Sequence, residues 1–339
     1  MRVFEAHPSF IAGCEFSPHP WLRNAHAMTV AGALWPRRAR RLPAGEARRF
    51  EVEAGTSLLA KCHWQAGRRE RATLVVVHGL EGSSESGYMR GLAELAFAAG
   101  LNVLRVNQRT CGGSEDLTPT LYCSALSNDY RAILRELIER ERLPAVYFAG
   151  YSMGGNLVLK MAGELGEDAP PELRGVCGVC PTIELAACVD AIGQPGNALY
   201  QRHFVQKLKA RLRRKARRSP GRFTLNGIER VRTVRGFDDA ITAPHFGYRD
   251  ADDYYFRASA CRVTGRIAVP ALIVTAQDDP VVPFSIFGGA EVRGNPRICV
   301  VAPERGGHCA FISRFSGGER FWAEARVAEF CAGAGIGKG

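Results

Sequence analysis

The sequence GYSMG at residues 150–154 decides how this chain folds, because it separates two segments of different character. The segment 143–149 before it is short and apolar, as expected of a buried strand. The segment 155–161 after it is typical of a helix. A G-x-S-x-G sequence in this context predicts a tight strand–turn–helix connection that exposes the serine hydroxyl at the end of a sheet. Glycine is needed there because neighbouring backbone must pass with no side chain in the way. Ser152 is therefore the predicted nucleophile.

Two further loops carry the groups that a serine nucleophile requires. A serine hydroxyl is a weak nucleophile at its own pKa, so it needs a base within hydrogen-bond reach and a group that orients the base. The apolar residues 267–274 predict a strand that ends in an acidic loop at residues 278–279. The apolar residues 297–301 predict the next strand, and two glycines and His308 follow it. This placement suits an imidazole that reaches over the edge of the sheet toward the serine.

These residues stand in the order serine, acid, histidine, which is one of the known chain orders of a catalytic triad. We predict that Ser152 attacks the substrate and that His308 acts first as general base and then as general acid. One aspartate of the pair orients the imidazole. Asp279 is preferred because it lies four residues before the proline of a Val-Pro pair, and Asp278 stays the alternative.

The predicted reaction also needs two backbone N–H groups directed at the negative charge that develops on the substrate oxygen. One is the N–H of Met153, which follows the nucleophile. The other is predicted from the loop after the strand at 73–78, where His-Gly-Leu places the N–H of Leu80. His78 is interpreted as shaping this loop and not as a second base. The chemistry calls for no metal ion and no organic cofactor.

Apolar runs and helix-type segments alternate from about residue 51, which predicts an α/β fold with a mostly parallel sheet and helices on both faces. The predicted strands are 73–78, 101–106, 144–150, 174–180, 267–275 and 297–302, and earlier strands near 49–53 and 58–64 bring the sheet to eight. The predicted helices are 86–99, 124–141, 153–165 and 320–333. Residues 1–50 form a predicted N-terminal arm that prolines divide into short pieces, and residues 51–181 and 267–339 form the core. The polar, helix-rich residues 182–266 form a predicted lid inserted into that core.

The chain resembles the YheT-like branch of the α/β-hydrolases, also called the AB hydrolase 4 family, along nearly its whole length. The matching motifs are LRNAH at 22–26, HGLEGSS at 78–84, NQR at 107–109, GYSMGGN at 150–156, FD at 237–238, YY at 254–255, DDP at 278–280 and GH at 307–308. The resemblance implies an α/β-hydrolase fold and serine esterase or lipase activity on short- to medium-chain acyl esters. Thr110, Ala310 and Met28 depart from the family pattern, and these departures bear on local loop shape.

The net charge of +11 is concentrated in one segment. Residues 202–235 hold thirteen Lys or Arg and one acid, so the remainder of the chain is close to neutral. Within this segment Phe204, Leu208 and Leu212 recur at helical spacing, which predicts a basic amphipathic helix over 204–215. Three interpretations stay open: a lid helix that packs its leucines on the core, attraction to anionic lipid or acidic substrates, and nucleic-acid binding. The last is disfavoured because no recognition motif accompanies the charge.

Eleven cysteines stand in a chain whose start lacks the apolar core of a secretory signal. We therefore expect a cytoplasmic protein with reduced thiols. Cys177 and Cys180 form a C-x-x-C within a predicted buried strand, where core packing is favoured over a metal or redox role. Cys309 follows His308 directly, so its modification would be expected to block activity.

The predicted function is hydrolysis of a carboxylic ester through an acyl-enzyme on Ser152, with a small acyl ester as the partner molecule. Two alternatives remain at this stage. Acyl transfer to an alcohol uses the same residues, and a catalytically silent hydrolase fold would bind a lipid or a protein through its basic lid.

Overall fold

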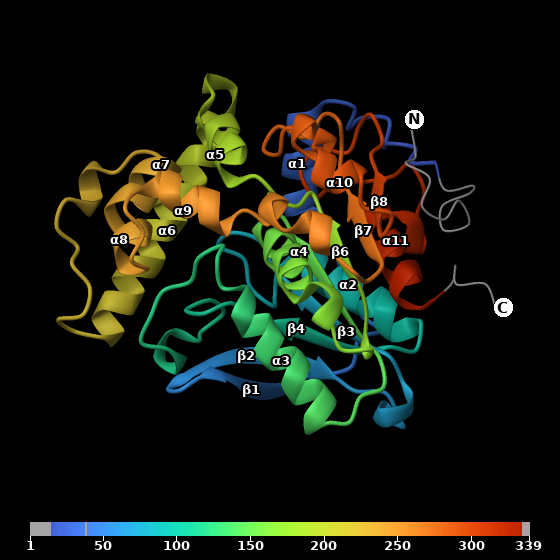
Figure 1. Ribbon diagram of the computed structural model, residues 1–339. Helices are drawn as coiled ribbons and strands as arrows, with labels where there is room; N and C mark the ends of the chain where they lie inside the picture. The colour runs from blue at the N-terminus through green and yellow to red at the C-terminus, as the bar shows by residue number, and fades with distance from the viewer. Residues whose placement is uncertain (1–14, 38, 334–339) are drawn as a thin grey trace.

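Eight strands form one sheet in the computed structural model, which describes residues 15–37 and 39–333 (Figure 1). The strands are β1 (Glu46–Glu53), β2 (Thr56–His63), β3 (Thr73–Val77), β4 (Asn102–Val106), β5 (Val146–Tyr151), β6 (Leu173–Val179), β7 (Ala271–Val274) and β8 (Ile298–Val301). Their order across the sheet is β1-β2-β4-β3-β5-β6-β7-β8. The β1–β2 and β2–β4 pairs are antiparallel, and the five pairs from β4 to β8 are parallel. The predicted fold class, α/β with a mostly parallel eight-stranded sheet, is confirmed.

Helices cover both faces of the sheet. The helices of the core are α2 (Gly87–Ala98), α3 (Ser127–Glu139), α4 (Met153–Leu165), α10 (Ala290–Arg293) and α11 (Trp322–Cys331). Alternate side chains of β3 point to opposite faces, as the pleat requires. Val75 and Val77 join the apolar cluster under α3 and α4, and Leu74 and Val76 join the cluster under α2 and α11. The central strands are buried on both faces, which is why they read as unbroken apolar runs.

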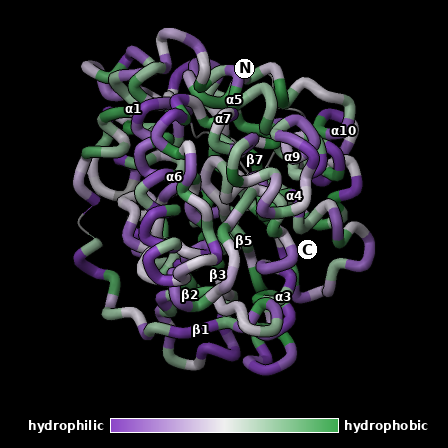
Figure 2. Tube along the Cα trace, turned by 90° about the vertical axis from the view of Figure 1, so that its left-hand side faces the viewer, coloured by the Kyte–Doolittle hydropathy of each residue, from purple (hydrophilic) through white to green (hydrophobic). Residues whose placement is uncertain are grey.

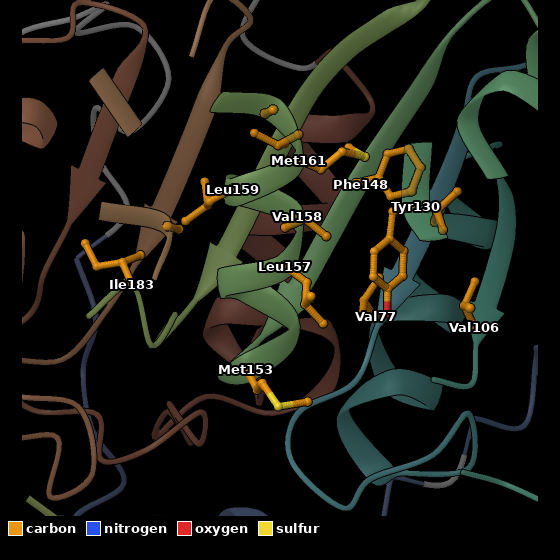
Figure 3. Close-up of a cluster of buried hydrophobic side chains, with 14 of the residues drawn as sticks. Val77, Val106, Tyr130, Phe148, Met153, Leu157, Val158, Leu159, Met161 and Ile183 are labelled. Atoms are coloured by element: carbon orange, nitrogen blue, oxygen red, sulfur yellow. The ribbon is translucent and has the colours of Figure 1, made fainter. Parts of the chain in front are cut away.

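The cluster under α4 fixes the helix that follows the serine. Leu157, Val158 and Met161 of α4 are buried together with Phe148 of β5 and Tyr130 of α3, and Figure 3 shows these side chains packed beside one another. Burying side chains of this size stabilises the fold by about 1.5–3 kcal/mol each. The helix that follows Ser152 is therefore anchored in the core.

The N-terminal arm contains one regular helix. Its first fourteen residues lie outside the described part of the chain, but α1 (Ala25–Leu34) is a regular helix between two of the prolines. Asn24 caps it, because the Asn24 side chain accepts hydrogen bonds from two backbone N–H groups of the first turn. Figure 1 shows α1, in blue, beside the orange and red segments from the end of the chain. Arg37 makes a buried ion pair with Glu324 of α11, 2.7 Å from Nε to Oε1.

Residues 185–258 fold into five α-helices that lie to the left of the sheet in Figure 1. They are α5 (Leu185–Gly193), α6 (Ala198–Arg218), α7 (Val234–Phe237), α8 (Ala243–His245) and α9 (Ala251–Ala258), with a π-helical turn at Asp238–Thr242 between α7 and α8. The predicted amphipathic helix is α6, which is longer than expected at both ends. Leu208 and Leu212 are buried and Phe204 is half-buried. Figure 2 shows that α6 is composed mainly of hydrophilic residues.

The basic segment is less exposed than a fully solvated helix would be. Lys209, Arg211 and Lys215 of α6 are buried. Other arginines of the segment pair with acids from elsewhere in the chain, for example Arg214 with Glu115 at 3.0 Å. From the sequence, charges were counted only within residues 202–235. That count therefore did not include these acidic partners, which lie in other parts of the chain.

Two negative findings concern the described residues. Their ten cysteines are all free thiols. None of the helices placed by the structure combines the length and the apolar composition that crossing a membrane requires.

Candidate active site

Ser152 lies in a sharp turn between β5 and α4. Its backbone is in an unfavourable region for a residue with a side chain, with φ 52° and ψ −119°. A Cβ at Gly150 would lie 2.1 Å from the backbone oxygen of Gly154, and a Cβ at Gly154 would lie 2.5 Å from the backbone oxygen of Val77. Only glycine fits at both positions. The two glycines of the motif thus allow the chain to turn within one residue, and the serine side chain stands at the edge of the sheet.

The parallel register brings the predicted loops to the same edge. Val77, the last residue of β3, pairs with Gly150 of β5, so the loop after β3 emerges beside Ser152. On the other side, Val179 of β6 pairs with Val274 of β7. The carboxyl ends of parallel strands are where loops converge to form sites in open α/β sheets.

Ser152, His308 and Asp279 form a continuous chain of hydrogen bonds. His308 Nε2 lies 3.0 Å from Ser152 Oγ, and His308 Nδ1 lies 2.8 Å from Asp279 Oδ2. The other oxygen of Asp279 accepts the backbone N–H groups of Val281 and Val282 at 2.8 and 3.0 Å. The carboxylate is therefore fixed from two sides, and it fixes the imidazole with Nε2 directed at the serine.

The neighbouring aspartate has a different contact. Asp278 Oδ1 accepts the backbone N–H of Gly307 at 2.9 Å, one residue before the histidine. Asp278 thus holds the loop that carries His308, and the carboxylate that touches the imidazole is that of Asp279.

Asp279 controls the proton affinity of His308. Burial of the imidazole disfavours its charged form, but the charge of Asp279 and its hydrogen bond to Nδ1 outweigh burial and raise the pKa of His308. The resulting imidazolium is the species that a general base becomes after it accepts the serine proton.

The loop after β3 presents one backbone N–H without an acceptor. The Gly79 N–H donates to Tyr88 Oη at 3.1 Å and the Glu81 N–H donates to Tyr122 Oη at 2.9 Å. Among the hydrogen bonds of the described residues, the N–H of Leu80 between them has no acceptor, and neither does the N–H of Met153.

His78 is wholly buried. Its Nδ1 contacts the Gly79 carbonyl at 2.8 Å, and its Nε2 accepts the Gln108 N–H at 3.1 Å. Burial lowers the pKa of His78 to about 4. Both ring nitrogens are therefore engaged in shaping the loop.

A pocket of about 690 Å³, partly open to solvent, lies beside Ser152 between the core and residues 182–266. Apolar side chains supply most of its lining, among them Leu80, Met153, Leu185, Val189, Leu208 and Val234. One part of the wall is polar and includes Asp238. Its carboxylate accepts the hydroxyls of Thr242 and Tyr255, each at 2.7 Å, and burial raises the pKa of Asp238 to about 6.

Sequence reasoning missed a buried ion pair between α6 and the loop after β3, which carries Leu80 and is called the Leu80 loop below. Arg211 Nε of α6 lies 2.6 Å from Glu81 Oε1, with side chains 2% and 5% exposed. Tyr122 Oη donates to the same carboxylate at 2.9 Å, and the guanidinium lies over the Tyr122 ring. The alternation of lysine and arginine along α6 gave no signal that one of them points inward.

Two other groups at the histidine were also missed. Thr29 Oγ1 of α1 accepts the backbone N–H of His308 at 2.9 Å, so the arm helps to place the imidazole. Cys180, directly after β6, contacts the same loop, where its Sγ accepts the Cys309 N–H at 3.3 Å. The donor atoms of Cys180, His308 and Cys309 lie within 4.8 Å of one another.

Comparisons with known proteins bear on the fold and the family. Residues 72–315 match the family model described as the alpha/beta hydrolase fold. The chain is 32% identical over 324 residues to the Escherichia coli (strain K12) protein named "Putative esterase YheT", which covers 95% of this chain and 94% of that one. It is 28% identical over 245 residues to Phospholipase ABHD3 of Mus musculus, which covers 71% of this chain and 59% of that one. Among solved structures, the Pyrococcus furiosus esterase Pf2001 superposes with a TM-score of 0.56 at 17% identity, over 84% of this chain and 91% of that one, which is a likeness of fold.

Proposed function

The chain belongs to the α/β-hydrolase family, in its esterase and lipase-type branch with YheT, and from this membership we propose that it is a serine carboxylesterase. The proposed reaction is the cleavage of short- to medium-chain acyl esters through an acyl-enzyme on Ser152. One observation carries the proposal: the unbroken hydrogen-bond chain from Ser152 Oγ through the imidazole of His308 to Asp279.

In the first proposed half-reaction, His308 Nε2 accepts the Ser152 proton as Oγ attacks the carbonyl carbon of the ester. Asp279 stabilises the imidazolium that forms. The negative charge on the carbonyl oxygen is received by the backbone N–H groups of Leu80 and Met153. Removal of one such donor commonly costs about 10²–10³ in kcat, so this contribution is large.

The first half-reaction ends when the imidazolium gives its proton to the departing alcohol, which leaves an acyl group on Ser152, and the second half-reaction then begins. Water then enters, His308 accepts its proton, and the hydroxide attacks the acyl carbon. The proton held by His308 passes to Ser152 as the acid departs. The serine proton leaves and returns along the contact between Nε2 and Oγ that measures 3.0 Å, and the same Nε2 donates to the alcohol and accepts from water.

The pocket supports an acyl substrate of modest length. Its lining is mainly apolar, as a hydrocarbon chain requires, and α5, α6 and α7 contribute to it. We propose that residues 182–266 act as the lid that closes this pocket and limits the entry of water. We further propose that exposed basic side chains of the lid, such as Lys207 and Arg217, attract the anionic surface of a lipid aggregate.

The experiment that tests the function is hydrolysis of p-nitrophenyl esters from acetate to palmitate. Wild type is compared with Ser152→Ala, which removes the nucleophile, and with Ser124→Ala, which alters a serine that lines the same pocket without a contact to His308. We expect Ser152→Ala to abolish turnover and Ser124→Ala to retain it, with an optimum at short to medium chains.

Labelling of the same variants with a fluorophosphonate separates the remaining possibilities. Labelling of Ser152 without hydrolysis of any ester would favour transfer of the acyl group to an alcohol other than water. Equal behaviour of wild type and Ser152→Ala in both assays would refute the proposal and favour a silent fold that only binds its partner.

A further inference from the structure

Two thiols lie beside the edge of His308 that faces the serine. Cys309 Sγ is 3.8 Å from His308 Nε2, and the Sγ of Cys180 completes a group whose donor atoms all lie within 4.8 Å of one another. We propose that Cys180, His308 and Cys309 form a binding site for a borderline-soft divalent cation such as Zn²⁺, and that the bound cation inhibits the enzyme. The binding site stands on geometry alone, and the inhibition rests on the proposed esterase function.

The spacing of the three donors suits a tetrahedral zinc site. Zn–S distances of about 2.3 Å and Zn–N distances of about 2.0–2.1 Å place tetrahedral ligand atoms roughly 3.5–3.8 Å apart. The contact between Cys309 Sγ and His308 Nε2 already has that length. The remaining separations lie within 4.8 Å, so these donor atoms must still move closer together when a cation binds.

The histidine is prepared as a metal ligand by its second partner. Metal-binding imidazoles usually donate their other N–H to a carboxylate, which fixes the ring and raises its basicity. His308 Nδ1 has this contact with Asp279 Oδ2 at 2.8 Å, so Nε2 is the nitrogen left to bind a cation. Ser152 Oγ is 3.0 Å from Nε2, and the serine hydroxyl or a water molecule takes the fourth position.

The backbone holds the two thiols in place. The N–H of Cys309 donates to Cys180 Sγ at 3.3 Å, and Cys309 Sγ contacts the Val179 carbonyl at 3.6 Å. Both cysteines have positive φ, 44° at Cys180 and 57° at Cys309. These rarely adopted conformations turn the end of β6 and the histidine loop toward each other.

Binding exchanges protons for the cation. Two thiols and one Zn²⁺ give a zinc dithiolate and two released protons, with no change of oxidation state. Because binding releases these two protons, affinity for the cation must increase with pH. The bound cation occupies the Nε2 lone pair that would otherwise accept the Ser152 proton, and ester hydrolysis stops.

Cobalt and zinc titrations under a non-thiol reductant test the site. Co²⁺ gives a thiolate charge-transfer band only when sulfur ligates it, and Zn²⁺ displaces it. We expect one such band in wild type and in Ser152→Ala. We expect more than about tenfold weaker binding in Cys180→Ala and in Cys309→Ala, because loss of a residue that only hydrogen-bonds to a metal ligand already costs about 10–100-fold. Cys188→Ala is the matched control, since this buried thiol lines the pocket but lies outside the group.

The activity assay tests the consequence. Zn²⁺ is expected to inhibit ester hydrolysis by wild type and by Cys188→Ala. It is expected not to inhibit the Cys180→Ala/Cys309→Ala double variant. The absence of a charge-transfer band in wild type, or equal inhibition of wild type and the double variant, would overturn the proposal. A band in a protein that hydrolyses no ester would refute the proposed function and leave the cation site standing.

Discussion

Replacing Arg211 by methionine tests whether a buried charge holds α6 to the Leu80 loop. The pair with Glu81 has side chains that are 2% and 5% exposed. Two unit charges about 4 Å apart attract by about 4 kcal/mol at an effective dielectric constant of roughly 20. Removal of one partner leaves the other buried and unpaired, which costs about 3–5 kcal/mol. Because Tyr122 still donates to Glu81 at 2.9 Å, we expect Arg211→Met to lower the free energy of unfolding by the smaller value, about 3 kcal/mol.

Urea unfolding of four variants measures this free energy. Arg213→Met is the control on the same helix: its partner is Glu229, the side chains are 36% and 73% exposed, and the expected loss is under about 1 kcal/mol. Glu81→Gln leaves Arg211 buried and charged, so it should be as costly as Arg211→Met. The double variant of Arg211 and Glu81 should lose clearly less than the two single losses added together, because no unpaired charge remains. Equal losses for Arg211→Met and Arg213→Met, or strict additivity, would refute the role of the ion pair.

Three further outcomes follow from the site. Asp279→Asn should lower kcat by about 10⁴ with little change in KM, whereas Asp278→Asn, which affects only the loop, should cost far less in the same p-nitrophenyl ester assay. His308 must be neutral to act as a base, and Asp279 raises the pKa of His308, so kcat/KM should fall as pH is lowered through a midpoint above about 6.5. A midpoint well below that value would contradict the pairing of Asp279 with His308. Gly150→Ala should unfold the protein in a thermal melt or severely weaken it, because its Cβ would lie 2.1 Å from a backbone oxygen; Gly193→Ala, in open space at the end of α5, should change stability by no more than about 1 kcal/mol.

The core could be predicted from the sequence because each of its strands and turns is marked by a pattern of neighbouring residues. The central strands are apolar on both faces, so β3 and β5 lie within one or two residues of the predicted bounds. The turn at Ser152 has a fixed motif because the backbone crowding tolerates only glycine. The pairing of Asp279 with His308 could also be expected, since each follows a predicted strand and neighbouring parallel strands end at one edge.

The contacts that could not be predicted from the sequence join segments that are far apart in the chain. Arg211 and Glu81 are 130 residues apart, and neither stands in a pattern that distinguishes it from its solvated neighbours. Thr29 contacts His308 across 279 residues, and only the resemblance at residues 22–26 indicated that the arm mattered. Thr110, a departure from the family pattern, adopts the left-handed φ of 62° that glycine favours, and its hydroxyl accepts from Arg211.

The contact of α1 with the histidine loop has a consequence for the order of events during translation. Thr29 is made 279 residues before His308, and the ion pair of Arg37 with Glu324 joins the same two parts of the chain. A growing chain can complete the sheet as far as β7 while Ser152 still has no contact with His308. The imidazole can take its place beside Ser152 only after the loop that carries His308 has been made and has met α1. Such late closure also makes folding slow, since contacts of large sequence separation form after a long search.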